Sequence, residues 1–181
     1  MARAATPYSE LDLAGDYALT SPVRKTRAVI RLPGDVHTAL LDAGIIEDPY
    51  FADNEQAVMW VNQTPWAVER RFTASEADVA GYLTLTLENV DTIATVRLNG
   101  EVVAQTQNMF LRYDIDLSGK LRAGDNTLRI EFAVARDVAW ERSNAHPFPI
   151  PFTYNYKSNG LPGVPLNFIR KAACHAGWDW G

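Results

Sequence analysis

The last five residues of the chain combine side chains suited to binding a polar ligand that also has flat apolar faces. They are Gly177, Trp178, Asp179, Trp180 and Gly181. An indole offers a broad apolar face with a polar N–H at its rim, and a carboxylate offers only hydrogen-bond acceptors. A sugar has the complementary features, a C–H face that stacks on a ring and paired hydroxyls that donate. The same residues also fit a tight turn that holds two core tryptophans, with Asp179 capping its own loop. The motif alone leaves both interpretations open.

The other residues with catalytic or ligand chemistry are scattered along the chain. His37, His146 and His175 lack the spacing of a zinc site, so each is expected to be a surface or hydrogen-bonded residue. Cys174 lies beside His175, but neighbours on a strand point to opposite faces. A buried, inert thiol is therefore expected at Cys174. We predict no metal site and no cofactor.

The composition describes a globular protein without a nucleic-acid or membrane partner. A length of 181 residues suits one domain with a sizeable core. A formal charge of −5 and the lack of a basic stripe argue against nucleic-acid binding. No apolar run is long enough to span a bilayer, and residues 1–8 lack the apolar core of a secretory signal. We expect a cytoplasmic protein; a periplasmic or secreted location stays open, because a signal can precede this sequence.

The N-terminal part of the chain divides into a lead-in and the start of the main domain. Residues 1–27 are expected to form the lead-in, with a first strand between Ser9 and Thr20. Residues 28–181 are expected to form the main domain, which begins with a short strand at 28–32 and a Pro-Gly turn.

A short helix is predicted directly after this turn. Asp35 is suited to cap it, and the helix should run to about Ala43, with Gly44 as its C-terminal stop. Leu40 and Leu41 are expected to face the core.

A second helical stretch is predicted from Glu55 to Val61, with Asn54 as its cap. The residues before it, 48–54, show no hydrophobic period, so an ordered loop is expected there.

From Trp66 onward, apolar residues alternate with polar ones, a period typical of strands with one buried face. Asn99-Gly100 predicts a two-residue hairpin turn, and no ligand is expected at it. Asp114, Asp116 and Asp125 should be solvated on an outer face or in a turn. The pattern has no long amphipathic helix, so it favours an all-β fold, an antiparallel β-sandwich. The strands are expected near 66–72, 83–87, 94–98, 113–117 and 128–134, with one more after Gly100.

The periodicity stops after Arg136. Residues 144–165 contain five prolines and several aromatic residues, too many aromatics for a flexible linker. A long aromatic loop on a sandwich either packs as a lid or lines a site.

Together these segments resemble the N-terminal, galactose-binding-like domain of the β-mannosidases in glycoside hydrolase family 2. The resemblance covers about Pro33 to Gly181. It is carried by five segments, which are the run from Pro33 to Trp60-Val61, Asn89 to Gly100, Asn108-Met109-Phe110, Gly124 to Leu128, and Arg170 to Gly181. The run from Asn89 to Gly100 is shared across family 2, and the Trp-Asp-Trp-Gly ending is narrower.

The resemblance implies a jelly-roll fold and a role for the last residues. Family 2 enzymes are retaining glycosidases, whose two glutamates lie on a downstream (β/α)8 barrel, and a retaining pair sits about 5–5.5 Å apart. By this resemblance Asp179 would accept hydrogen bonds from sugar hydroxyls, Trp178 would wall the pocket, and Trp180 would pack. The implied partners are a mannose-containing oligosaccharide and the downstream barrel. Ala173 departs from the family pattern, since many relatives have glutamine there.

The implied function is therefore that of an N-terminal domain of a retaining β-mannosidase acting on terminal non-reducing β-D-mannose. The domain would supply a substrate-pocket loop and no catalytic carboxylate, so it would be inactive alone. It is also expected to be truncated before its last strand. Two alternatives stay open: a stand-alone carbohydrate-binding module, or a purely structural domain of another family 2 glycosidase of the β-galactosidase or β-glucuronidase type.

Overall fold

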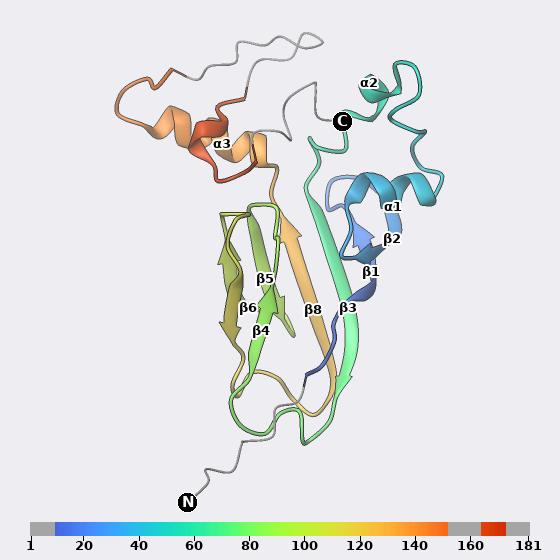
Figure 1. The fold of residues 1–181 in the computed structure, drawn as a ribbon, viewed down its shortest axis with the longest axis vertical. Coiled ribbons are helices and arrows are strands. Elements are labelled where there is room, and N and C mark those ends of the chain that lie inside the picture. The colour runs from blue at the N-terminus through green and yellow to red at the C-terminus, as the bar shows by residue number, and fades with distance from the viewer. Residues whose placement is uncertain (1–9, 152–163, 173–181) are drawn as a thin grey trace, which may run out of the picture.

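The computed structural model describes residues 10–151 and 164–172. Eight strands form two antiparallel sheets (Figure 1). The larger sheet has the order β2-β1-β3-β8-β5-β6, and the smaller one pairs β4 with β7. The strands are β1 (Gly15–Thr20), β2 (Arg27–Leu32), β3 (Trp66–Ala74), β4 (Thr84–Leu87), β5 (Ala94–Leu98), β6 (Glu101–Thr106), β7 (Tyr113–Asp116) and β8 (Gly124–Phe132). The helices are α1 (Val36–Asp42), α2 (Asn54–Val58), α3 (Ala135–Ala145) and the 3₁₀ turn η2 (Leu166–Phe168).

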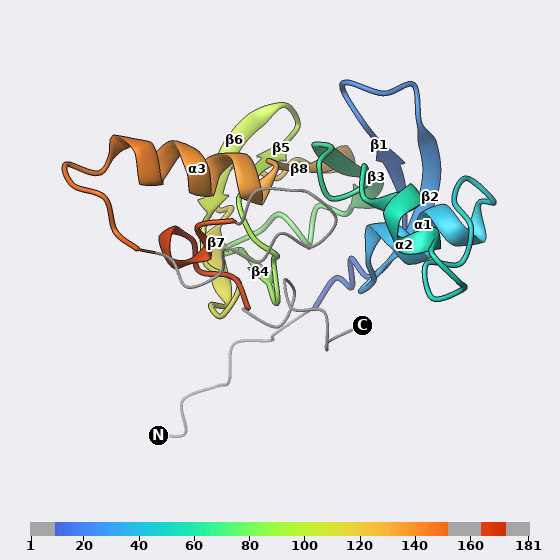
Figure 2. The ribbon, with the colours of Figure 1, turned by 90° about the horizontal axis from the view of Figure 1, so that it is seen from above.

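The core lies between the two sheets. In the larger sheet, Val68 pairs with Ile130 and Ile130 with Val96, and all three side chains are buried. Opposite them, the pair Leu85–Ile115 of the smaller sheet is also buried. Seen from above, β4 and β7 lie across one face of the larger sheet (Figure 2). Apolar and polar residues alternate along each strand, so the apolar side chains of one sheet pack against those of the other. This packing is the predicted β-sandwich.

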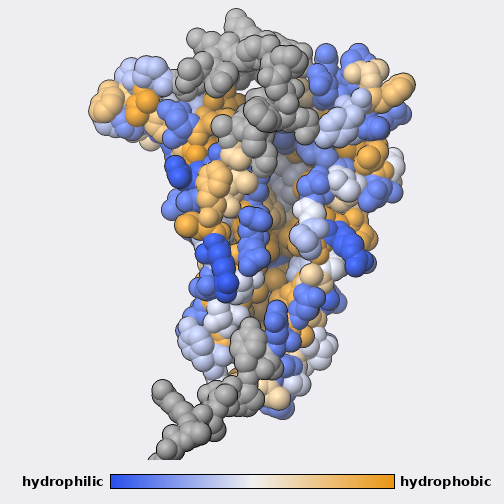
Figure 3. All heavy atoms as spheres, in the orientation of Figure 1, coloured by the Kyte–Doolittle hydropathy of each residue, from blue (hydrophilic) through white to orange (hydrophobic). Residues whose placement is uncertain are grey.

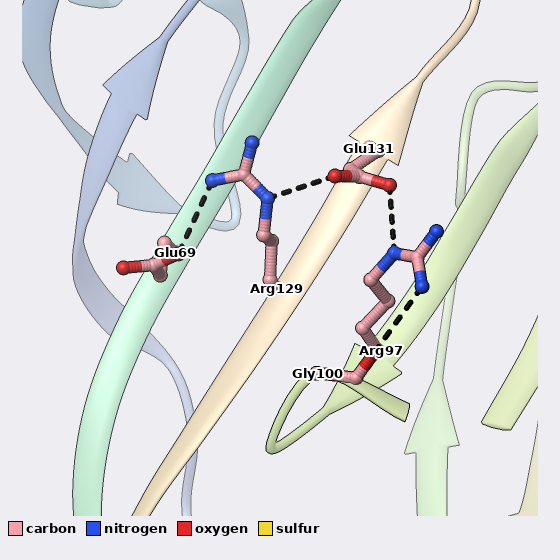
Figure 4. Close-up of polar contacts among 5 residues, drawn as sticks. All are labelled: Glu69, Arg97, Gly100, Arg129 and Glu131. Carbon is pink, nitrogen blue, oxygen red and sulfur yellow. Dashed lines mark hydrogen bonds and ion pairs between the residues drawn. The ribbon is translucent and has the colours of Figure 1, made fainter. Parts of the chain in front are cut away.

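The outer face of the larger sheet carries a charged ladder across β3, β8 and β5 (Figure 4). Arg129 Nη1 donates to Glu69 Oε2 at 3.1 Å, and Arg129 Nε donates to Glu131 Oε1 at 2.9 Å. The other oxygen of Glu131 accepts from Arg97 Nε at 2.9 Å. Hydrogen bonds from Arg129 and then from Arg97 hold the pKa of Glu131 below its ordinary value. These four half-buried groups pair with one another through ion pairs and hydrogen bonds. The ladder is therefore interpreted as structural.

The first helix forms as predicted, with one correction. Asp35 is its N-cap, and its Oδ1 accepts from the backbone N of Thr38 at 2.9 Å. Gly44 follows the helix with a φ of +64°. Leu40 is fully buried, but Leu41 is 39 % exposed, so the prediction that both face the core was wrong for Leu41. Adjacent helical residues point about 100° apart, and only one can face β2.

The second helix starts earlier and ends earlier than predicted. Asn54 is its first residue, and Asp53 takes the N-cap position without a side-chain hydrogen bond. The Asn54 amide instead donates to the carbonyl of Asp48 at 3.0 Å, which stabilises the preceding loop. The helix ends at Val58, and turns lead from there to β3.

The Asn99-Gly100 hairpin turn is present. Both residues have positive φ values, 52° and 88°, as a type I′ turn requires. The Asn99 side chain also accepts from the backbone N of Thr127 at 2.9 Å and donates to Asn126 Oδ1 at 2.8 Å. The turn is thereby fixed to the start of β8.

The longest helix, α3, was missed by the sequence analysis. It follows β8 directly and spans Ala135–Ala145, yet Ala139 is its one buried residue. A helix that buries a single small side chain leaves no apolar period in the sequence.

The predicted early strand is β1, which pairs with both β2 and β3. The domain boundary at residues 27 and 28 stays a prediction.

Candidate functional site

One end of the sandwich collects the helices, and we call it the helical end. Trp66, the first residue of β3, pairs with Phe132, the last residue of β8. Because α2 precedes β3 and α3 follows β8, both helices lie at this end (Figure 1). The opposite end, where Ala74 pairs with Gly124, holds the Asn99-Gly100 turn, and we call it the turn end.

The segment that leads to the Trp-Asp-Trp motif is attached to the helical end. Asn108 forms an isolated parallel bridge with Arg170. The backbone N of Met109 donates to the Arg170 carbonyl at 3.0 Å, and the backbone N of Ala172 donates to Met109 Sδ at 3.0 Å. Residues 170–172 therefore run beside the loop that follows β6.

Side chains reinforce this attachment from both sides. Lys171 forms an ion pair with Asp91, in the loop between β4 and β5. Arg142 of α3 donates to the carbonyl of Phe168 at 3.2 Å and to Gln107 Oε1 at 3.1 Å. The helix that the sequence analysis missed thus supports η2 and the loop after β6 together.

The predicted substrate-binding residues, Trp178 and Asp179, lie outside the described residues, as do Ala173, Cys174 and His175. Their roles remain predictions. Gly177, where the motif begins, is the fifth residue after Ala172.

A shallow depression of about 270 Å³ lies beside this segment. It is lined by Glu88, Asn89, Phe110, Leu111 and Arg112. The Phe110 ring is exposed, and the guanidinium of Arg170 sits 5.8 Å from its centroid. An aromatic face, a carboxylate and an amide next to one another are the groups that sugar rings contact. The sequence analysis named Phe110 within a family motif but assigned it no role.

A second depression, of about 430 Å³, lies at the turn end and is lined in part by Arg71, Asn99, Arg122 and Asn126. Its two amide side chains are occupied by internal bonds. Asn126, which is almost fully buried, donates to the carbonyls of Arg122 and Gly124 at 2.7 and 3.0 Å. The hydrogen-bonding capacity of these amides goes into holding the turn.

The histidines within the described residues have structural surroundings. Burial lowers the pKa of His37, and the nearby Asp35 carboxylate opposes this shift only in part. His146 packs edge-on against Phe148 with ring centroids 4.5 Å apart. In residues 10–151 and 164–172, no group of three His, Cys, Asp or Glu residues is placed to hold a metal. Over the same ranges, no helix is both long and apolar enough to cross a membrane.

The acidic residues that were expected to be solvated make local bonds. Asp114 accepts from Thr86 Oγ1 at 2.7 Å and from Arg112 Nε at 2.9 Å, and these bonds lower its pKa. Ser118 lowers the pKa of Asp116 in the same way. Asp125 accepts from Thr73 at 3.2 Å.

The two-sheet antiparallel sandwich defines a class of protein, the galactose-binding-like β-sandwich domains. Residues 17–181 match the family described as the glycosyl hydrolase 2 galactose-binding domain-like family, and the chain belongs to that family.

Several proteins similar to this chain are named β-mannosidases. A bovine β-mannosidase is 32 % identical over 98 % of this chain, and a probable β-mannosidase of Caenorhabditis elegans is 30 % identical over 94 %. A crystal structure of a β-D-mannosidase from Dictyoglomus thermophilum superposes with a TM-score of 0.81 and 30 % identity over 94 % of the chain. This chain spans only 19–20 % of the length of these relatives.

Proposed function

We propose that this chain is the N-terminal domain of a retaining β-mannosidase that removes terminal non-reducing β-D-mannose from oligosaccharides. The support is the identity of 30–32 % to proteins named β-mannosidase over nearly the whole chain. The relatives are about five times longer, which leaves room for the (β/α)8 catalytic barrel that a family 2 enzyme requires. In this proposal the two catalytic glutamates come from that barrel, and the protein acts in the cytoplasm.

The observation that carries the role of this domain is the fixed path of residues 170–172. A loop that contributes to a pocket must be held at its base, because a displacement of about 1 Å can cost about 100-fold in rate. The Asn108–Arg170 bridge and the Lys171–Asp91 ion pair supply that base. Asp179 would then accept hydrogen bonds from hydroxyls remote from the scissile bond, and Trp178 would exclude water from the pocket.

The test is hydrolysis by the full-length polypeptide, with Asp179→Asn compared with wild type on aryl β-mannoside, β-galactoside and β-glucuronide. One charge-assisted bond contributes about 1.5–3 kcal/mol, so kcat/KM on the mannoside should fall roughly 10- to 150-fold. Asp125→Asn, at the turn end, is the matched control and should leave kcat/KM unchanged. If Asp179→Asn kept the wild-type kcat/KM, the proposal that Asp179 binds the substrate would be wrong.

The alternatives give different results in the same set of measurements. Preference for the galactoside or glucuronide would replace the β-mannosidase assignment with another family 2 activity. Millimolar or tighter binding of mannose by the 181-residue chain alone, with no hydrolysis by the full polypeptide, would indicate a stand-alone carbohydrate-binding module.

A further inference from the structure

Exposed aromatic side chains gather at one end of the molecule. Among the described residues, four of the five exposed Phe and Tyr side chains lie at the helical end, and these are Tyr50, Phe51, Phe110 and Phe148. The fifth, Tyr82, follows β3 at the turn end. In the space-filling view, hydrophobic surface appears at both upper corners, over the α3 side and over the α1–α2 side (Figure 3).

The densest group runs from the last turn of α1 to the loop before α2. Leu41, Ile45, Tyr50 and Phe51 are all exposed, and Tyr50 and Phe51 are 79 % and 71 % exposed. We call these four residues the 41–51 patch. These four side chains lie within eleven residues of chain, and exposed apolar side chains that form one contiguous surface mark interaction sites.

The 41–51 patch is held in a defined conformation. Asp48 accepts from the backbone N of Tyr50 through its side chain at 2.9 Å and from the backbone N of Phe51 through its carbonyl at 3.2 Å. The backbone N of Asn54 then donates to the Phe51 carbonyl at 3.2 Å. The buried Ile46 ties the same segment to the core. The aromatic rings are therefore presented on a preorganised loop, which lowers the entropy cost of binding a partner.

The charges around the patch have one sign. Residues 42–55 contain five acidic residues and no lysine or arginine, and the whole stretch 32–69 has no lysine or arginine. Within residues 10–151 and 164–172, no ion pair involves any of the five acidic residues, which are Asp42, Glu47, Asp48, Asp53 and Glu55. Burial lowers the pKa of His37, the histidine nearest in sequence, which favours its neutral form.

The acidic charges around the patch favour a partner surface that carries basic residues. Two copies of the patch would bring like charges together, and an anionic lipid surface would repel it. The complementary surface is apolar with a rim of lysine and arginine. About four-fifths of each β-mannosidase relative has no counterpart in this chain, and residues 170–172, which lead onward along the chain, are bound at the same end.

We propose that the 41–51 patch docks onto the catalytic domain of the same polypeptide, against an apolar surface rimmed by basic residues. This inference rests on the proposed function, because it requires a downstream domain. It adds a second attachment beside the motif segment, so that the domain is held at two separated places on the helical end. The acidic rim would set the orientation of the two domains, and the rings would supply the buried area.

The test is side-chain labelling of the full-length polypeptide by hydroxyl radicals, read by mass spectrometry. Tyr50 and Tyr82 are equally exposed in this domain, at 79 % each, so Tyr82 is an internal control of the same chemistry. Docking predicts that Tyr50 and Phe51 are labelled at least fivefold less than Tyr82. Equal labelling of Tyr50 and Tyr82 would overturn the proposal.

Two further measurements identify the occupant. Protection of Tyr50 that persists on hundredfold dilution supports an intramolecular contact, whereas loss of protection on dilution would indicate a second copy and overturn the proposal. Charge reversal by Glu47→Lys with Glu55→Lys should raise labelling of Tyr50 severalfold, and Glu101→Lys on β6 is the matched control. Unchanged labelling of Tyr50 in the double variant would contradict the proposal that basic residues rim the partner surface.

Hydrolysis by the same preparation separates this inference from the proposed function. Hydrolysis of the aryl β-mannoside with Tyr50 and Tyr82 labelled equally would leave the function standing and remove the docking surface. Protection of Tyr50 in an enzyme that prefers another glycoside would keep the docking surface and remove the β-mannosidase assignment.

Discussion

Asn108 and Arg170 form a parallel β-bridge although they lie far apart in the sequence. The bridge joins the loop after β6 to the segment that precedes the Trp-Asp-Trp motif, and the Lys171–Asp91 ion pair lies next to it. The strands of the sandwich thereby determine where residues 170–172 run. A change in this attachment should affect substrate binding through the motif, because the motif begins only a few residues later.

We predict that Lys171→Met lowers kcat/KM of the full-length enzyme on an aryl β-mannoside by about 3- to 10-fold, since a misplaced positioning group weakens transition-state binding. The effect should appear mainly in KM, because the catalytic carboxylates lie elsewhere in the proposed enzyme. Lys25→Met, in the exposed loop between β1 and β2, is the control. Equal kinetics for the two variants would show that the ion pair does not position the motif.

The charged ladder of the outer face should contribute measurably to stability. Glu131 accepts hydrogen bonds from two arginines, and Glu131→Gln retains its shape while removing its charge. We expect a loss of roughly 0.5–1.5 kcal/mol in the free energy of unfolding, limited by the partial exposure of the group. Urea unfolding measures this loss. Glu101→Gln, exposed on β6 without an ion pair among the described residues, should change the free energy by less.

The same carboxylate predicts a direction of pH dependence. Its hydrogen bonds from Arg129 and Arg97 lower the folded-state pKa of Glu131 below the ordinary 4.5. Its contribution is therefore fully present above pH 4.5 and is lost as the pH falls through the lower, folded-state value. The difference in unfolding free energy between wild type and Glu131→Gln should shrink over that interval. A difference that stays constant from pH 7 down to the acid transition would contradict this account.

Two consecutive leucines of α1 should differ in their effect on stability. Leu40 is fully buried, and Leu41 is 39 % exposed. Leu40→Ala should cost about 2–4 kcal/mol in the 181-residue chain, because it leaves a cavity against β2. Leu41→Ala should cost less than about 1 kcal/mol there. If Leu41 is covered by a downstream domain, its substitution should cost more in the full-length polypeptide than in the 181-residue chain.

The sequence predicts the strands well because each one buries alternate residues between two layers. Val96 and Leu98 of β5 show this period, and the Asn99-Gly100 turn follows with φ values that few other residue pairs adopt. The order of the strands in the sheet, in contrast, cannot be predicted from local sequence. β3 pairs with β8 and β8 with β5, and nothing local in the sequence specifies these distant partners. The fold class was therefore predictable, whereas the strand order was not.

The helical end was harder to predict than the sheets. α3 buries only Ala139, so it has no apolar stripe, and Leu41 looks like a core residue until the helix is placed against β2. Tyr50 and Phe51 were expected only within an ordered loop at residues 48–54, because the exposure of a side chain depends on tertiary structure. Trp178 and Asp179 were predicted from their types and family motif alone. Nothing in the described residues tests that prediction.

The last prediction concerns two glycines whose substitution by alanine should lower the free energy of unfolding for different reasons. Gly100 has a φ of +88°, yet an added Cβ would have no heavy atom within 4 Å, so Gly100→Ala should cost only about 1 kcal/mol from the left-handed backbone. At Gly34, an added Cβ would overlap the backbone carbonyl oxygen of Arg31, which cannot move without disturbing β2. Gly34→Ala should therefore reduce the free energy of unfolding by more than Gly100→Ala does, as measured by urea unfolding of both variants. The reverse order would show that the turn into α1 can relax and that the Asn99-Gly100 turn cannot.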